Sequence, residues 1–152
     1  VTADTLRHII AHQGKPIIAV GTTTVRTLES LYWFGVQLQQ NPDLDHMHIN
    51  QWDPYILPQG SALRMEESYS NILHWMERHD TDRIDGETQL MIAPGYQYHV
   101  IDGLVTNFHQ PKSTLLLLVS ALIGDRWRDC YRYALDHEFR FLSYGDSCLF
   151  LP

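Results

Sequence analysis

The sequence has few cysteines, no long apolar segment and no closely spaced cysteine pair of the kind that binds a metal. Cys130 and Cys148 are its two cysteines, and it contains no CxxC, so neither a disulfide framework nor a thiolate metal site is expected. The longest apolar stretch, residues 115–123, is far shorter than the roughly 20 residues of a membrane span. These absences predict a cytoplasmic protein with no membrane partner.

Cations are also scarce. Eleven lysines and arginines stand against 18 aspartates and glutamates, a net charge of −7 with neutral histidines. This balance argues against a broad basic surface that grips nucleic acid, although a partner domain could supply one. The chain opens on Val1 without the pattern of a secretory signal, so we expect a start inside a longer protein.

What the sequence does contain is an alternation of short branched runs with amphipathic segments. This pattern predicts an α/β fold, a mixed β-sheet flanked by helices that forms part of a larger α/β domain. Residues 16–20 predict a strand buried on both faces, Asp102-Gly103 predicts a hairpin turn, and the polar residues 35–60 predict a long loop. We expect helices at 2–12, 25–34, 61–79 and 114–124 and from 125, and strands at 16–20, 88–92, 96–101, 104–109 and 147–151.

Glycine-rich phosphate signatures of the GxxxxGK[ST] and GxGxxG kinds are absent. In their place, one segment combines a strand end, a tight turn and a helix that opens with hydroxyl residues. Gly21 permits the turn, while Thr22, Thr23 and Thr24 can cap the helix or donate to a ligand. Arg26 adds a cation near the helix N-terminus, so this turn is predicted to hold an anion.

A second segment of the same design follows the strand at 104–109. By the period-2 rule, Asn107 and His109 share one strand face, with His109 at the carboxyl end where ligands of open α/β sheets lie. Lys112, Ser113 and Thr114 open the next helix. A histidine, an amide and a lysine that converge there could handle a proton, a hydroxyl and an anion.

Each of these segments also has a purely structural interpretation. The threonines could serve only as helix caps, Lys112 could be a solvated lysine, and His109 could be a hydrogen-bonded structural residue. His46 and His48 form an H-x-H pair that could bind a metal on a strand. Since no third ligand is in view, we expect no metal site.

Four segments, in the right order and over nearly the whole chain, resemble signatures of the S-adenosylmethionine:tRNA ribosyltransferase-isomerases. Residues 19–30 are similar to AVGTTSVRTLES, with Thr24 in place of serine. The other three are residues 86–96, similar to G-x-T followed by I-x-PGY, residues 102–116, similar to DGLITNFHLPKSTLL with Gln110 in place of leucine, and residues 139–146, similar to YRFFSYGDA. The resemblance implies the C-terminal part of the family's main α/β domain, with an insertion near 35–85.

In this family the ribosyl group of S-adenosylmethionine is transferred and isomerised onto 7-aminomethyl-7-deazaguanine in tRNA, which gives epoxyqueuosine-tRNA, adenine and methionine. The resemblance therefore implies S-adenosylmethionine as a substrate, tRNA carrying the queuosine precursor as a partner, and no cofactor. It implies catalytic roles for His109, Lys112 and Asp146, without deciding which is the base. The substrate-binding residues that it implies are Gly21, Thr22, Thr23, Arg26, Asn107, Ser113, Thr114 and Tyr144.

The family's N-terminal portion has no counterpart in this chain, so we expect the chain alone to be inactive and to expose apolar surface. Its oligomeric state is left open. The alternative function is a non-catalytic α/β domain that binds a nucleotide or scaffolds the rest of the enzyme. An ordinary methyltransferase ranks lower, because the glycine-rich turn after a first strand that such enzymes usually show is absent.

Overall fold

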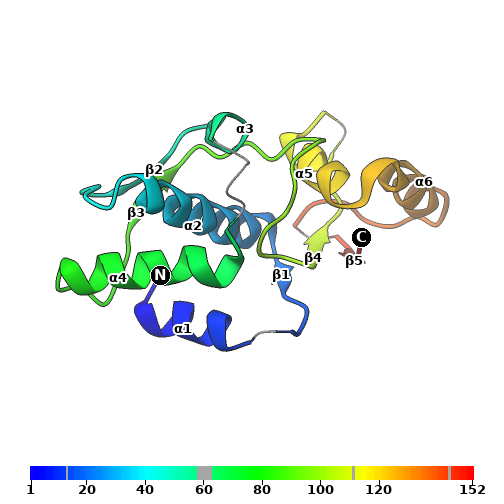
Figure 1. Cartoon of the computed structure of the whole chain (residues 1–152). Coiled ribbons are helices and arrows are strands. Elements are labelled where there is room, and N and C mark those ends of the chain that lie inside the picture. The colour runs from blue at the N-terminus through cyan, green and yellow to red at the C-terminus, as the bar shows by residue number, and fades with distance from the viewer. Residues whose placement is uncertain (13, 58–62, 111, 144) are drawn as a thin grey trace. The chain divides into compact units, whose positions relative to one another are not determined.

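The computed structural model describes residues 1–12, 14–57, 63–110, 112–143 and 145–152. The chain divides into two compact units, unit 1 from Val1–Lys15 and Thr27–Met91 and unit 2 from Pro16–Arg26 and Ile92–Pro152. Helices and strands alternate, which confirms the predicted α/β class (Figure 1). The elements are α1 (Ala3–Ala11), β1 (Ile18–Val20), α2 (Thr22–Gln40), β2 (Met47–Ile49), α3 (Asp53–Ile56), α4 (Met65–Arg78), β3 (Gly86–Thr88), β4 (Gly103–Asn107), α5 (Thr114–Ile123), the 3₁₀ turn η2 (Gly124–Arg126), α6 (Trp127–Asp136) and β5 (Ser147–Phe150).

Unit 2 contains a mixed three-stranded sheet in the order β1-β4-β5. β4 is central, parallel to β1 and antiparallel to β5. The prediction that residues 17–20 and 104–109 share one sheet is therefore confirmed. Ala19, Leu104 and Phe150 lie side by side in the register and are buried, so they form the core face of this sheet.

The expected hairpin at Asp102-Gly103 is wrong. Residues 96–101 form no strand, and β4 pairs with β1 and β5 instead. The Asp102 carboxylate accepts a hydrogen bond from the Ile17 backbone N–H at 2.8 Å, and its own N–H donates to the Ile17 carbonyl at 2.8 Å. Asp102 thus ties the entrance of β4 to that of β1, and the local Asp-Gly signal was misleading because tertiary pairing overrides turn propensity.

The expectation that β1 is buried on both faces is also wrong. Ala19 is buried, whereas Ile18 and Val20 are exposed on the opposite face. The same face of β5 carries Leu149, also exposed. The apolar run still marks a strand with two hydrophobic sides, but only one side is covered within the described residues.

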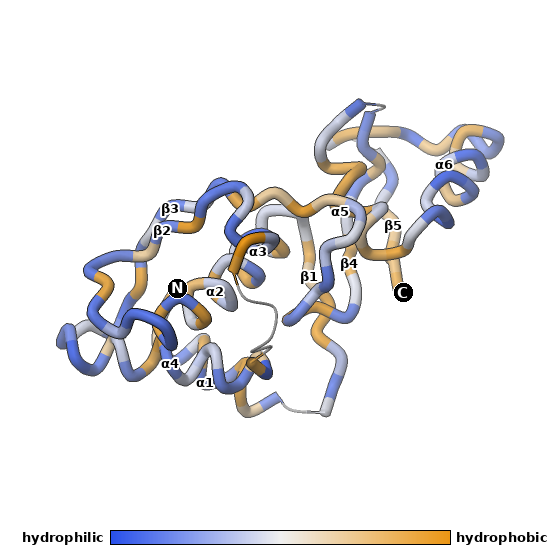
Figure 2. The backbone as a smooth tube through the Cα atoms, turned by 45° about the horizontal axis from the view of Figure 1, so that its top comes forward, coloured by the Kyte–Doolittle hydropathy of each residue, from blue (hydrophilic) through white to orange (hydrophobic). Residues whose placement is uncertain are grey.

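The helices of unit 2 complete its core. α5 begins at its N-cap Ser113 and is apolar along most of its length, as its orange colour in Figure 2 shows. The ring of Tyr131 on α6 meets that of Phe108 edge-on at 5.2 Å between centroids, and Phe139 meets Phe108 at 5.7 Å. No helix among the described residues is long and apolar enough to span a membrane.

In unit 1, α2 and α4 pack closely enough to require a glycine. α2 was expected to end at Phe34 but continues to Gln40. Gly35 does not end the helix, because it is the position at which α2 contacts α4. A β-carbon at Gly35 would lie 2.2 Å from the Ser68 carbonyl oxygen. The Ser68 hydroxyl donates to the Tyr32 carbonyl at 2.6 Å, and the Asn71 amide donates to the Gly35 carbonyl at 3.1 Å.

The polar stretch predicted as a loop holds regular structure. It contains the end of α2, strand β2 and the short helix α3. β2 pairs in parallel with β3. The strand expected at 88–92 is wrong, since β3 ends at Thr88 and residues 89–92 form no strand. Ser61, the expected cap of α4, lies outside the described residues, and the first turn is closed by Glu67, whose carboxylate accepts from the Arg64 backbone N–H at 2.9 Å. Whether residues 35–85 are an insertion stays a prediction.

Candidate active site

The turn after β1 is fixed by Gly21. Its φ angle is +88°, a conformation that side chains rarely adopt, and no atom lies within 4 Å of where a β-carbon would be. The glycine is therefore required by backbone conformation and not by space. Its N–H donates to the Val105 carbonyl at 2.8 Å, so this donor belongs to the sheet and not to a ligand.

The threonines that follow have different surroundings. The Thr24 hydroxyl donates to the Val20 carbonyl at 2.7 Å and so extends the strand-to-helix connection. Thr23 is exposed and Thr22 is half-buried at the first residue of α2. Thr24 therefore has a structural role, while Thr22 and Thr23 remain predicted binding residues.

Arg26 has an unusual environment one turn into α2. Its Nε atom is buried and, within the described part of the chain, has no hydrogen-bond partner. A buried donor without a partner costs about 1–3 kcal/mol, so buried polar groups are nearly always paired. An anion that accepts from this guanidinium would remove the cost, which agrees with the predicted anion-binding role.

The carboxyl end of β4 leads to His109, but not in the predicted geometry. β4 ends at Asn107, so the strand alternation does not extend to position 109. The His109 Nε2 atom lies 3.2 Å from the hydroxyl of Thr106, which is buried and alternates with Asn107 along the strand. The expectation that Asn107 and His109 share one face is therefore wrong, because the backbone turns after residue 107.

His109 is held from both its backbone and its side chain. Its N–H donates to the Tyr131 hydroxyl at 3.0 Å. Burial lowers the pKa of His109 below its ordinary value of 6.5, so the ring is neutral near pH 7 and can accept a proton. The Cys148 thiol donates to the Thr106 carbonyl at 3.2 Å, and burial raises the pKa of this thiol to about 11, which leaves it protonated.

Thr106 and Tyr131, whose hydroxyls contact His109, were not indicated by the sequence, and neither was Cys148, whose thiol bonds to the Thr106 carbonyl. Tyr131 lies on the expected apolar stripe of α6, where its ring is explained by packing alone. Nothing in the local sequence indicates that its hydroxyl accepts from residue 109, since the two residues are 22 positions apart.

The segment 112–114 starts α5. The Ser113 hydroxyl accepts from the Leu115 N–H at 3.2 Å, so this predicted binding residue is the N-cap of the helix. Lys112 is exposed, with φ of +64°, and Thr114 is exposed at the first helical position. Lys112 and Thr114 thus remain accessible to a ligand.

Asp146 closes the loop that precedes β5. Its carboxylate accepts from the Arg140 backbone N–H at 2.8 Å and pairs with the Arg140 guanidinium at 3.1 Å. The hydrogen bonds from Arg140 lower the pKa of Asp146, so this group is ionised at neutral pH. It is suited to accept a hydrogen bond from a substrate hydroxyl and poorly suited to donate a proton. Tyr144 lies outside the described residues.

Sheet topology brings these segments to one edge. β1 and β4 are parallel, so the turn at Gly21 and the segment containing His109 both leave the sheet at its carboxyl edge. β5 is antiparallel, and its first residue, Ser147, pairs with Asn107, so Asp146 enters at the same edge. The Leu142 N–H also donates to the Phe108 carbonyl at 2.9 Å. The two segments of similar design therefore follow neighbouring strands of one sheet, and we expect them to face a common cleft.

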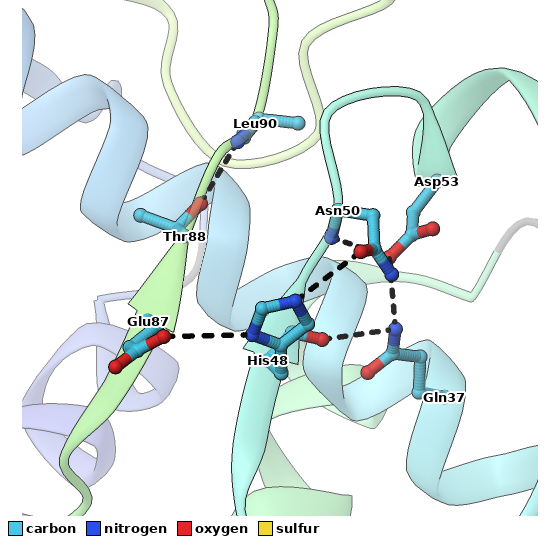
Figure 3. Close-up of polar contacts among 7 residues, drawn as sticks. All are labelled: Gln37, His48, Asn50, Asp53, Glu87, Thr88 and Leu90. Carbon is cyan, nitrogen blue, oxygen red and sulfur yellow. Dashed lines mark hydrogen bonds and ion pairs between the residues drawn. The ribbon is translucent and has the colours of Figure 1, made fainter.

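The H-x-H pair of His46 and His48 lies in unit 1, whereas the segments described above belong to unit 2. The His48 ring lies between Asn50, with 3.2 Å from Nε2 to the amide oxygen, and Glu87, with 3.9 Å from Nδ1 to the carboxylate (Figure 3). Asp53 accepts from the Asn50 N–H at 2.7 Å and from the Gln37 amide at 3.2 Å. Among the described residues, no group of three or more histidine, cysteine, aspartate or glutamate side chains could hold a metal.

These features define the class of the protein. It is an α/β protein with a mixed sheet, at whose carboxyl edge a buried arginine nitrogen, a neutral histidine and an ionised carboxylate are supplied by three separate segments. A model of the queuosine biosynthesis protein family matches residues 1–150. The chain belongs to this family.

Curated relatives agree with the family match. The chain is 40% identical over 152 residues to the S-adenosylmethionine:tRNA ribosyltransferase-isomerase of Rhizorhabdus wittichii, covering 99% of this chain and 31% of that protein. It is 39% identical to the enzyme of the same name from Novosphingobium aromaticivorans, covering 99% and 32%. The chain thus spans about a third of the length of these relatives.

A solved structure is similar as well. The crystal structure of S-adenosylmethionine tRNA ribosyltransferase from Thermotoga maritima matches with a TM-score of 0.63 and 32% identity. The match covers 99% of this chain and 39% of that one. The fold described above is therefore the fold of the corresponding part of a family member.

Proposed function

We propose that this chain forms part of an enzyme that transfers and isomerises the ribosyl group of S-adenosylmethionine onto 7-aminomethyl-7-deazaguanine in tRNA. The products would be epoxyqueuosine-tRNA, adenine and methionine. The observation that carries the proposal is the convergence of the Gly21, His109 and Asp146 segments at one edge of a mixed sheet. Membership of the queuosine biosynthesis family supports it.

Each of these residues is suited to a different role in the proposed reaction. Removal of a proton near the sulfonium-activated C5′ position needs a neutral base, and the lowered pKa of His109 suits that role. The buried Nε of Arg26 can donate to the methionine carboxylate or a phosphate. The ionised Asp146 can accept from a ribose hydroxyl, and Lys112 adds a second cation. S-adenosylmethionine is here a substrate, and we assign no cofactor.

The active protein needs more than these 152 residues. Ile18 and Val20 on β1 and Leu149 on β5 expose an apolar sheet face, with Val20 exposed to 69% and Leu149 to 54%. In the register Val20 lies beside Val105, and Val105 beside Leu149, so the face is continuous across all three strands. We infer that the rest of an enzyme of the relatives' length packs on this face and completes the site. The chain by itself should be inactive.

The site of action in the cell follows from the substrates. A tRNA under modification is a cytoplasmic substrate, and both cysteines are free thiols, as a reducing compartment favours. We propose that the enzyme works in the cytoplasm.

A labelling experiment tests the function. An enzyme of the relatives' length that carries this chain is given precursor-bearing tRNA and S-adenosylmethionine labelled in the ribose or in the methyl group. Ribose label should enter the tRNA, with one adenine released for each transfer. Methyl label in the tRNA would indicate a methyltransferase. Absence of both labels, with S-adenosylmethionine bound, would favour the non-catalytic alternative.

A further inference from the structure

Unit 2 contains a cavity of about 340 Å³ lined by the start of α5 and the start of α6. Its walls are mainly apolar and include Pro94, Leu117 and Trp127. Lys112 and Arg128 also line it, so two cations accompany an apolar surface. Ligand pockets usually measure about 300–1,000 Å³, so this one has room for a single ring system with a small attached group.

The aromatic wall is held in place by its neighbours. The Tyr131 ring meets Trp127 nearly perpendicular at 5.7 Å between centroids, and Tyr131 itself is buried and bonded to His109. The Arg128 guanidinium carbon lies 5.1 Å from the Trp127 ring centroid. The guanidinium lies over one face of the indole, so a nucleic-acid base would stack on the other face or on the guanidinium plane.

The negative net charge of the chain does not come from the unit that contains this cavity, so it does not argue against RNA binding there. Unit 1 carries five lysines and arginines against 12 acidic residues, whereas unit 2 carries six of each. The net charge of −7 therefore belongs to unit 1 alone. At the cavity Arg128 pairs with Asp125, while Lys112 has no ion-pair partner in the described part of the chain. Lys112 is thus available to a phosphate.

We propose that this cavity binds one nucleotide of the RNA substrate, with its base on Trp127 and its phosphate held by Lys112 and Arg128. The assignment rests on the proposed function, which makes RNA the partner. The occupant is a nucleotide and not S-adenosylmethionine, because two cations at the cavity attract a phosphate. S-adenosylmethionine has one carboxylate, which its sulfonium and ammonium cations outweigh, so the same two cations disfavour it.

Binding of a fluorescein-labelled anticodon stem–loop RNA to the purified chain, followed by anisotropy, tests the assignment. Trp127→Ala should weaken binding by roughly 5- to 150-fold, the range that stacking of one base supplies. Trp127→Phe should restore most of it. Lys112→Gln and Arg128→Gln should each lower the slope of log affinity against log salt by about 0.7–1.

Matched controls come from the same chain. Trp52→Ala removes an exposed tryptophan of unit 1, and Arg132→Gln removes an arginine on α6 that does not line the cavity. Both should bind RNA like the wild type, and circular dichroism should show each variant folded. S-adenosylmethionine is titrated in parallel by calorimetry, where Trp127→Ala should have no effect.

Three results would overturn the assignment: no RNA binding by the wild-type chain, equal binding by Trp127→Ala and wild type, or a loss confined to S-adenosylmethionine. Failure of the proposed function can be distinguished from failure of the nucleotide site. Ribose transfer by the longer enzyme together with Trp127-independent RNA binding rejects the nucleotide site alone. Trp127-dependent binding without ribose transfer rejects the enzymatic function and keeps the site.

Discussion

The backbone N–H of Gly21 donates to the carbonyl of Val105 at 2.8 Å, so the turn after β1 is tied to β4 two residues before that strand ends. This bond fixes how far the start of α2 lies from the segment that carries His109. Two motifs separated by more than 80 residues of sequence are thereby held at one edge of a sheet.

His109→Ala, in an enzyme of the relatives' length, should lower turnover by about 10²–10⁴-fold, the usual contribution of a positioned acid or base. The dependence of the rate on pH should report the protonation of His109. Because burial lowers the pKa of His109 below 6.5, the base is already neutral above that pH, and the rate should fall only as acid protonates it. His137→Ala is the control, since that exposed ring hydrogen-bonds to the Tyr133 carbonyl and stacks on the Tyr133 ring, one turn back in the same segment. Wild-type turnover in folded His109→Ala would return this residue to a structural role.

Asp146→Asn should loosen the loop before β5 and reduce stability at neutral pH. The pKa of Asp146 is lowered in the folded protein by its hydrogen bonds from Arg140, so its contribution is present above the unfolded value of 3.8. That contribution is lost as the pH falls through the lower folded value. Chemical unfolding at several pH values measures this, with Asp136→Asn as the control on an exposed carboxylate. A wild-type advantage that persists unchanged below the folded pKa would contradict the proposed pairing.

Gly35→Ala should destabilise unit 1, although the same change usually stabilises a helix interior. The added β-carbon would lie 2.2 Å from the Ser68 carbonyl oxygen, so α2 and α4 must separate. Overpacking of this kind costs about 1–3 kcal/mol, measured as a loss of unfolding free energy in urea. Gln39→Ala, at an exposed position of the same helix, should be neutral or slightly stabilising. A Gly35→Ala variant as stable as the wild type would show that the helices are not held in close contact.

The double variant Val20→Lys and Leu149→Lys should reduce self-association of the isolated chain, measured by light scattering after gel filtration. Both side chains are exposed on the uncovered sheet face. In an enzyme of the relatives' length the same pair should lower stability and turnover, because two lysines would be buried at an internal contact. Thr23→Lys, an exposed change outside this face, controls for added charge in the self-association assay. Adenine release by the isolated chain at the rate of the longer enzyme would contradict the view that the face is a contact with a missing part.

Sequence alone was sufficient for features that depend on neighbouring residues. Helix α5 follows from an apolar segment preceded by hydroxyl residues, and strand β5 from a short run near the C-terminus; the sequence alone leaves Ser113 and Thr114 as alternative caps, and the structure selects Ser113. The family could be inferred because four motifs occur in order, and each keeps its chemical groups at fixed spacing. Such signals are local, so they survive without any knowledge of the fold.

Tertiary structure decided which segments meet. The Asp-Gly pair before β4 has the chemistry of a hairpin, yet Asp102 bonds to Ile17, 85 residues away, because β4 pairs in parallel with β1 and not with the residues just before the turn. The hydroxyls that hold His109, those of Thr106 and Tyr131, come from a strand and a distant helix. Gly35 is a helix contact and not a helix end for the same reason. A local pattern states what a residue can do, and only packing against the rest of the chain determines which partner it meets.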